Sequence, residues 1–204
     1  MNQLDHPASV VAIFGSMGSG KTTWAANYIA NHRATLRFLF DPEGEFSRRF
    51  QIRPARSVEG LDLALATGWV CYQPDAMFTD DDAGLDFFSR WACAVSERTP
   101  GTKLFVVDEF QEYVSPGHTP DALKQVIHRG RRRGIDTVAI GQSPMEVGSK
   151  LRKQITSVVT YRFHEPGDLE WLEAYGFDPV AVNRLPQFGR LVRDRWGREK
   201  YEKP

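Results

Sequence analysis

Short apolar runs alternate along the chain with longer, helix-like stretches. The runs are rich in Val, Ile, Leu and Phe, which favours strands buried on both faces of a sheet. We predict seven strands, at Val10–Phe14, Leu36–Phe40, Trp69–Tyr72, Leu104–Val107, Thr137–Ile140, Ser157–Phe163 and Arg190–Arg193. Five helices are predicted between them, at Gly20–Asn31, Val58–Ala66, Asp82–Glu97, Asp121–Arg132 and Gly167–Tyr175. This alternation predicts an α/β fold with a mostly parallel sheet covered by helices on both faces.

Acidic residues mark two of the helix starts. Asp82 is expected to cap its helix, and Asp121 follows Pro120 at the start of another, where a carboxylate favours the positive end of the helix dipole. We expect a single domain over residues 1–195. The polar and charged tail, residues 196–204, is expected to be loose or to contact a partner.

The composition, 41% hydrophobic and 25% charged over 204 residues, is typical of an ordinary globular protein. The longest apolar runs fall far short of the roughly 20 residues that a membrane span requires. The sequence therefore predicts a protein that neither spans a membrane nor is secreted. Only two cysteines occur, Cys71 and Cys93, without a metal-binding spacing, so we expect reduced thiols in the core.

Charge is distributed unevenly although the net charge is zero. Residues 41–112 hold 14 Asp and Glu against 7 Lys and Arg, whereas residues 123–153 hold 8 Lys and Arg against 2 Asp and Glu. A localised basic surface can attract phosphates even when the whole molecule is neutral.

The stretch GSMGSGKT, Gly15–Thr22, satisfies the pattern GxxxxGK[ST] between a predicted strand and a predicted helix. Such a loop turns its backbone amides toward a phosphate at the helix N-terminus, and its glycines permit the positive dihedrals this requires. Lys21 is expected to reach the β and γ phosphates of ATP, and the Thr22 hydroxyl to ligand Mg²⁺. The predicted nucleotide-binding residues are Gly15, Ser16, Met17, Gly18, Ser19, Gly20, Lys21, Thr22 and Thr23.

A second motif, KLFVVDEF, places two adjacent carboxylates at the end of a buried strand. Asp108 is expected to hold Mg²⁺ through its water shell, and Glu109 to orient and deprotonate an attacking water. A small-molecule kinase needs no such glutamate, so the pair favours an NTP hydrolase. Gln142 ends the next apolar strand, where an amide can sense the γ-phosphate or position the water. As an isolated residue it would more often be a plain strand-end polar group.

With these motifs, the chain resembles the FtsK/HerA superfamily of P-loop DNA-pumping ATPases over most of its length. The resemblance rests on the phosphate loop, on VVDE, on FLFDPEGEF (Phe38–Phe46) and on GRRRGIDTVAIGQSP (Gly130–Pro144). It implies a P-loop NTPase three-layer sandwich of the additional-strand, RecA-like type. It also implies ATP hydrolysis by a homo-oligomeric ring, pentamer or hexamer, that moves double-stranded DNA.

The layout is most similar to the genome-packaging ATPases of tailless, internal-membrane icosahedral viruses. This likeness implies packaging of DNA into a preformed capsid, capsid-vertex proteins as partners, and a place in the host cytoplasm or at the packaging vertex of the virion. Three alternatives stay open: a Zot-like assembly ATPase of filamentous phages, whose motor is usually followed by a transmembrane helix, a small nucleotide kinase, and a scaffold that binds ATP without turnover.

Four arginines, Arg129, Arg131, Arg132 and Arg133, precede the Gln142 strand, and three interpretations compete for them. They can end a helix, where cations meet the negative end of the dipole. One of them can be an arginine finger inserted into the neighbouring subunit's site, and Arg131, three residues before Gly134, best matches the family's arginine. They can also contact the DNA backbone, together with Lys150, Arg152 and Lys153. Trp24 is expected in the core rather than as a platform for adenine.

Overall fold

The computed structural model of the protein describes residues 8–115 and 117–203, apart from the side chains of Arg131, Ser149 and Lys150. The described strands are β1 Val10–Phe14, β2 Leu36–Phe40, β3 Trp69–Tyr72, β4 Lys103–Val107, β5 Ile135–Gly141, β6 Ser157–Thr160, β7 Arg190–Asp194 and β8 Glu199–Glu202. The described α-helices are α1 Lys21–Asn31, α2 Glu45–Phe50, α3 Val58–Leu65, α4 Asp81–Arg98, α5 Asp121–Arg133, α6 Ser149–Arg152, α7 Pro166–Tyr175 and α8 Pro179–Asn183. All seven predicted strands and all five predicted helices are therefore present, with shifted ends at several of them.

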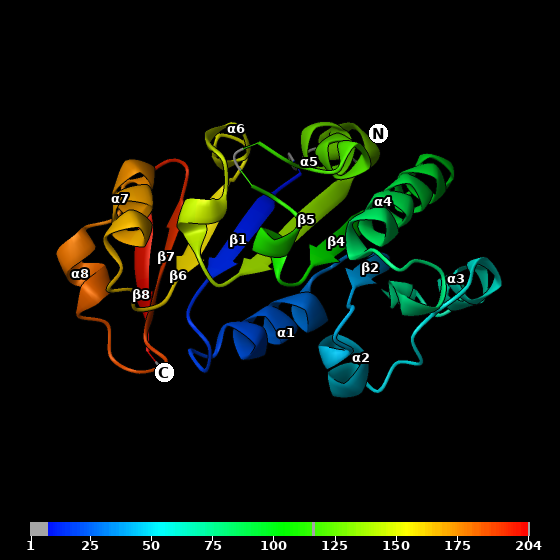
Figure 1. The fold of residues 1–204 in the computed structure, drawn as a ribbon, viewed down its shortest axis with the longest axis horizontal. Helices are drawn as coiled ribbons and strands as arrows, with labels where there is room; N and C mark the ends of the chain where they lie inside the picture. The colour runs from blue at the N-terminus through cyan, green and yellow to red at the C-terminus, as the bar shows by residue number, and fades with distance from the viewer. Residues whose placement is uncertain (1–7, 116, 204) are drawn as a thin grey trace.

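The strands form one sheet in the order β3-β2-β4-β5-β1-β6-β7-β8 (Figure 1). Strands β1 to β6 are parallel, and β7 and β8 add an antiparallel hairpin at one edge. Strand β5 lies between β1, which leads into the phosphate loop, and β4, which leads to Asp108 and Glu109. One extra strand thus separates the two motifs. The predicted additional-strand fold is confirmed.

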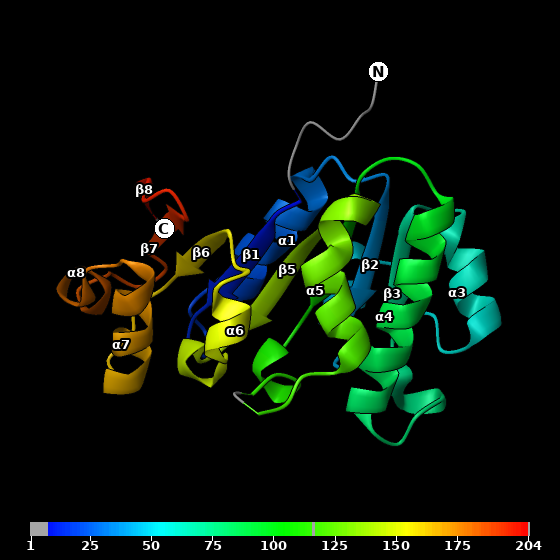
Figure 2. The same cartoon turned by 90° about the horizontal axis from the view of Figure 1, so that it is seen from above.

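Helices cover both faces of the sheet and make three layers. Figures 1 and 2 show α1 and α2 on one face and α4, α5 and α6 on the other. Side chains of the central strands alternate between two buried clusters: Val11 and Ile13 of β1 point toward α1, whereas Ala12 and Phe14 join the cluster under α4 and α5. Because both faces are buried, these strands read as continuous apolar runs.

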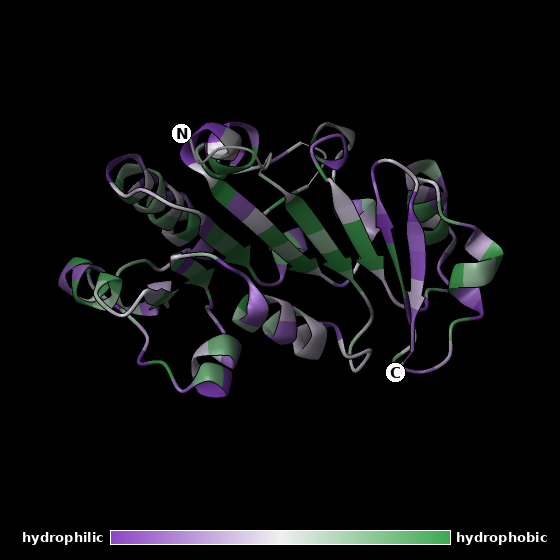
Figure 3. Cartoon of the chain, turned by 180° about the vertical axis from the view of Figure 1, so that it is seen from behind, coloured by the Kyte–Doolittle hydropathy of each residue, from purple (hydrophilic) through white to green (hydrophobic). Residues whose placement is uncertain are grey.

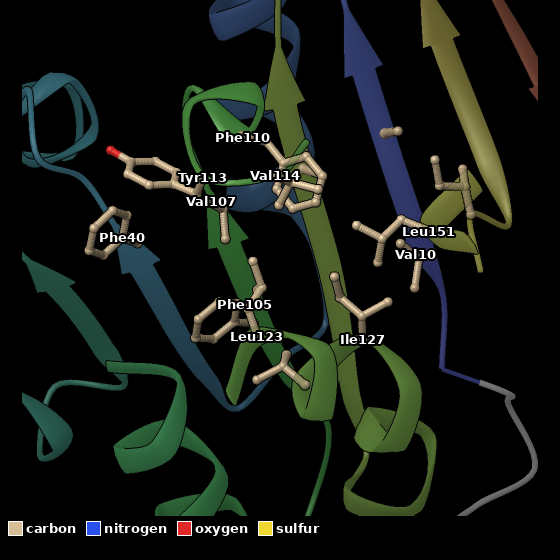
Figure 4. Packing of buried hydrophobic residues seen from close by; sticks show 14 of the residues in the cluster. Val10, Phe40, Phe105, Val107, Phe110, Tyr113, Val114, Leu123, Ile127 and Leu151 are labelled. Atoms are coloured by element: carbon tan, nitrogen blue, oxygen red, sulfur yellow. The ribbon is translucent and has the colours of Figure 1, made fainter. Parts of the chain in front are cut away.

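The larger cluster forms where α5 lies on the sheet. Figure 4 shows Leu123 of α5 beside Phe105 of β4, Ile127 of α5 over β5 toward Val10, and Phe110 and Tyr113 close to the end of β4. The turn that follows Asp108 and Glu109 is therefore fixed by core packing, which gives the two carboxylates a defined position.

The start of α4 corrects one prediction. The cap is Asp80, whose extended backbone and side-chain oxygen, 3.0 Å from the Asp82 amide, satisfy the first turn. Asp82 lies inside the helix and is not its cap. Cys71 and Cys93 are buried free thiols, as expected, and burial raises the pKa of both.

The C-terminal segment corrects another. Residues Glu199–Glu202 are not loose: they form β8, which pairs with β7 and carries ion pairs from Glu202 to Arg190 and from Glu199 to Arg193. Figure 3 shows that this hairpin is largely hydrophilic whereas the central strands are hydrophobic. The apolar pattern therefore did not predict β8. Among the described helices, none is long and apolar enough to cross a membrane.

Candidate nucleotide site

The phosphate loop, Gly15–Thr22, connects β1 to α1 at the carboxyl edge of the sheet. Gly18 and Gly20 have left-handed backbones, with φ of 75° and 95°. Gly20 precedes the first helical residue, and no side chain caps α1, so the first amides of this helix are left for a ligand. An anion is the ligand that such amides favour.

Space inside the loop is limited at Gly15. A Cβ atom at this position would lie 2.4 Å from the Ser19 hydroxyl oxygen, so the loop requires glycine there. The same hydroxyl is buried and has no hydrogen-bond partner among the described residues. A buried hydroxyl without a partner is costly, and a phosphate oxygen held in the loop would supply one.

Lys21 is buried at the start of α1, and its Nζ lies 4.0 Å from Oε1 of Glu109. The phosphate-loop lysine and the second carboxylate of KLFVVDEF are therefore brought together. Thr22 beside Lys21 is partly buried, whereas Ser16, Met17, Gly18 and Thr23 are exposed. The 4.0 Å separation is that of a loose ion pair, so Lys21 can exchange Glu109 for a phosphate at little cost.

Asp108 is buried directly after β4. Burial raises its pKa to about 7, the Glu109 amide opposes this by donating to Asp108 Oδ1 at 3.0 Å, and the nearby carboxylates of Glu109, Glu45 and Asp41 raise it further. A divalent cation at this carboxylate would offset both burial and repulsion. The donor set of Asp108 and Thr22, two oxygen ligands, fits Mg²⁺.

Glu109 has a left-handed backbone, with φ 44° and ψ 46°, which is uncommon for a residue other than glycine. Its Oε2 accepts hydrogen bonds from Nε2 of Gln111 at 2.6 Å and from Nε2 of Gln142 at 3.2 Å. Gln142 is thus beside the glutamate, as its place at the end of β5 predicted. The carboxylate is held between two amides and one lysine.

Gln111 is a site residue that sequence reasoning missed. Its Oε1 accepts from the Gln142 backbone amide at 3.0 Å, so one side chain joins Glu109 to the end of β5. A Cβ atom on Gly141 would lie 2.6 Å from this oxygen, so the contact needs glycine at position 141. The only signal in the sequence is an amide two residues after the glutamate, which is weak without the turn geometry.

The segment DPEGEF positions acidic groups near the same edge. Asp41 is fully buried and accepts from the amides of Phe46 at 3.0 Å and Ser47 at 2.8 Å, which fixes the start of α2. Glu45, the first residue of α2, is exposed and close enough to raise the pKa of Asp108. Asp41 therefore has a structural role, and Glu45 adds negative charge near Asp108.

The arginine segment, residues 129–133, lies at the amino ends of the parallel strands, which we call the amino edge of the sheet. The phosphate loop lies at their carboxyl ends, the carboxyl edge. Helix α5 ends at Arg133 and β5 begins at Ile135, whereas Gln142 follows the other end of β5, about 20 Å away along the strand. Arg133 bonds Glu97 through Nε at 2.9 Å and is mostly buried, whereas Arg129 and Arg132 are exposed. The side chain of Arg131 lies outside the described residues. The structure does not bring these arginines to the phosphate loop of the same chain.

The three residues proposed to extend the basic surface differ. The guanidinium of Arg152 lies over the Trp171 ring, 5.6 Å from its centroid, and Lys153 is exposed. The side chain of Lys150 lies outside the described part of the chain.

Solved structures of similar fold cover nearly the whole chain. The genome-packaging NTPase B204 from Sulfolobus turreted icosahedral virus 2, in complex with AMPPCP, is 19% identical over 98% of this chain and 99% of that chain, with a TM-score of 0.79. B204, the DNA-packaging ATPase from Sulfolobus turreted icosahedral virus, is 18% identical over 97% and 98%, with a TM-score of 0.76. The bacterial conjugative coupling protein TrwB is 12% identical over 95% and 84%, with a TM-score of 0.60.

No protein-family model and no curated protein sequence matches this chain. At such low identities the likeness concerns the fold. The fold expected from the FtsK/HerA resemblance is the one observed, with the sheet and helices of the viral packaging ATPases along the length of the chain.

Proposed function

We propose that this protein is an Mg²⁺-dependent ATP hydrolase whose turnover drives the movement of double-stranded DNA. One observation carries the hydrolase assignment: Glu109, beside the phosphate loop, is held by Lys21, Gln111 and Gln142. A glutamate held by amides next to a phosphate site is suited to orient and deprotonate a water. The hydrogen bonds from two amides fix its direction without neutralising its charge.

The phosphates of ATP bind to the amides of the loop from Gly15 to Thr23, with Lys21 on the β and γ phosphates. Thr22 would bind Mg²⁺ through its hydroxyl and Asp108 through the water shell of the ion, and the ion would neutralise charge on the phosphates. As Lys21 turns from Glu109 to the phosphates, the Glu109 carboxylate loses its cationic partner and its Oε1 is left to bond the attacking water. Glu109 is therefore released for catalysis only when the triphosphate is bound.

In the reaction, Glu109 takes a proton from a water as the water oxygen bonds to the γ-phosphorus. The bond from that phosphorus to the β–γ bridging oxygen breaks, and the electron pair leaves with ADP. Gln111 and Gln142 keep the carboxylate aimed at the water. Because Gln142 follows β5, a change in its amide on loss of the γ-phosphate is passed to this strand, which couples hydrolysis to movement.

We assign the DNA-moving role to a homo-oligomeric ring of five or six subunits that packages viral DNA into a preformed capsid. The likeness in fold to B204 and TrwB supports this assignment. The position of the arginine segment supports it too, since arginines at the opposite edge of the sheet serve a nucleotide only in a neighbouring subunit. The exposed Arg129 and Arg132 are suited to this role.

The test is phosphate release from Mg-ATP, with and without duplex DNA and without any other acceptor. Glu109→Gln is expected to bind ATP normally and to lose about 10² to 10⁴ in turnover, the range for removal of a general base. Glu112→Gln is the matched control, because Glu112 is exposed in the same turn. Wild-type turnover in Glu109→Gln would refute the assigned base, and no phosphate release from the wild type, with or without duplex DNA, would favour a kinase or a scaffold that binds ATP without turnover.

A further inference from the structure

An exposed aromatic side chain stands beside the phosphate loop and has no role in the chemistry described above. Phe188 precedes β7 and is 45% exposed. Its φ of 62° is left-handed, a conformation that is unfavourable for a residue other than glycine. Because the ring is not buried in the core, packing does not explain why this strained position carries phenylalanine.

The ring reaches the phosphate loop. A Cβ atom on Gly20 would lie 3.3 Å from Cδ1 of Phe188 and 3.8 Å from Cε1 of Tyr161. The Tyr161 hydroxyl donates to the Gly20 carbonyl oxygen at 3.2 Å. Two aromatic rings therefore flank the loop where it enters α1, on the side of β6 and β7.

The turn that carries Phe188 is fixed to the sheet and to α1. The Gly189 amide donates to the Pro186 carbonyl at 3.0 Å. Arg190 bonds Glu202 through Nε at 2.9 Å, and the same Oε2 of Glu202 accepts from Trp24 Nε1 at 3.1 Å. The C-terminal hairpin is thus tied to the helix that follows the phosphate loop, and Phe188 has a defined position relative to it.

Trp24, the other aromatic residue near the loop, is already engaged. It stacks on Tyr28 at a centroid distance of 5.4 Å and donates to Glu202. Phe188 is 45% exposed and, among the described residues, belongs to no aromatic pair, so part of its ring is accessible to another planar group.

We propose that the base of the bound nucleoside triphosphate stacks on Phe188. The proposal rests on the proposed ATP site and names the group that holds the end of ATP away from the phosphates. Phe188 is exposed and lies next to Gly20 of the phosphate loop, so its ring is within reach of the base of a nucleotide whose phosphates bind the loop. Stacking recognises the π-face of a base, and an exposed aromatic side chain offers the matching face.

The test compares two ligands, Mg-ATP and Mg-tripolyphosphate, by calorimetry. Tripolyphosphate offers the phosphates without a base. Phe188→Ala is expected to weaken ATP about tenfold or more and to leave tripolyphosphate unchanged, whereas Phe188→Tyr, which keeps the ring, should bind both as wild type does. Phe188→Gly should match Phe188→Ala and also relieve the backbone strain, which separates loss of the ring from loss of fold.

Tyr201→Ala is the matched control, since Tyr201 is also 45% exposed and lies on β8 of the same hairpin. It should bind ATP as wild type does. Unchanged ATP affinity in Phe188→Ala, or an equal loss for both ligands, would overturn the stacking role. Failure of the wild type to bind either ligand would instead overturn the proposed ATP site.

Discussion

The carboxyl and amino edges of the central sheet differ in how their charged side chains are paired. At the carboxyl edge, Asp108 is buried with other carboxylates nearby and with a raised pKa, and Glu109 has only a loose cationic partner. At the amino edge, buried cations are satisfied within the chain. Lys103 donates to the carbonyls of Ser96 and Arg133, each at 3.1 Å, and Arg133 bonds Glu97.

Each edge therefore requires a different partner that its own chain does not supply. At the carboxyl edge the carboxylates lack close positive partners among the described residues. Mg²⁺ and an arginine finger from a neighbouring subunit would supply that positive charge. The amino edge has spare positive charge in Arg129 and Arg132, which are exposed beyond the satisfied Arg133. In one chain these edges are about 20 Å apart along β5, so they can meet only between subunits.

The largest expected effect breaks that complementarity. Replacing Arg129, Arg131 and Arg132 together by alanine should lower turnover of the assembled protein about a thousandfold or more, because a trans arginine finger has that value. Single replacements then identify the finger, with Arg131 first from the sequence resemblance. Arg133→Ala is the matched control, and its turnover should stay near wild type because Glu97 holds this side chain. Equal losses in the triple variant and in Arg133→Ala would remove the distinction between the arginines.

A smaller effect is expected from removing one of the hydrogen bonds to the Glu109 carboxylate. Gln111→Ala should lower kcat about tenfold, since Gln142 still holds the carboxylate, while KM for ATP stays the same. Gly141→Ala should have a similar effect, because its Cβ would lie 2.6 Å from the Gln111 amide oxygen. Steady-state kinetics of Gln111→Ala, Gly141→Ala and the double variant measure the coupling. Additive losses would contradict a shared action through Gln111.

A separate effect concerns pH at Asp108, and it is measured in Mg²⁺ affinity and stability rather than in turnover. The carboxylate must ionise to hold Mg²⁺, so Mg²⁺ affinity of the nucleotide-free protein should fall about tenfold per pH unit below pH 7. Because the folded pKa lies above the ordinary value, ionisation costs stability, and the cost grows as pH rises from about 4 to about 7. Asp108→Asn should therefore stabilise the metal-free fold at pH 8 by up to about 4 kcal/mol, from about 1.36 kcal/mol per pH unit, and by nothing near pH 3. Urea unfolding at both pH values checks this, and equal differences at the two would contradict it.

The sequence predicted the parts whose signal is local. Val10–Phe14, Leu36–Phe40 and Trp69–Tyr72 match their strands residue by residue, because burial on both faces leaves runs that are apolar except at Arg37. The phosphate loop and the strand end at Asp108 were equally readable, since both motifs occur as contiguous residues.

The rest depends on tertiary geometry that no short pattern encodes. Gln111 reaches Glu109 only because of the left-handed turn at Glu109 and the missing Cβ at Gly141. Phe188 lies more than 160 residues along the chain from the phosphate loop it flanks, so no local sequence pattern links the two. Strand β8 is hydrophilic at a sheet edge, and it is held by ion pairs and by pairing with β7 rather than by burial.

The central claim, that one subunit's amino edge completes its neighbour's carboxyl edge, is tested most directly by mixing two inactive variants. Glu109→Gln lacks the base but can still donate an arginine, and the Arg129, Arg131 and Arg132 triple variant lacks the donor but keeps the base. We predict that a one-to-one mixture, with duplex DNA present, hydrolyses ATP well above the sum of the two separate preparations. A mixture no more active than its parts, in assemblies shown to contain both variants, would contradict the account.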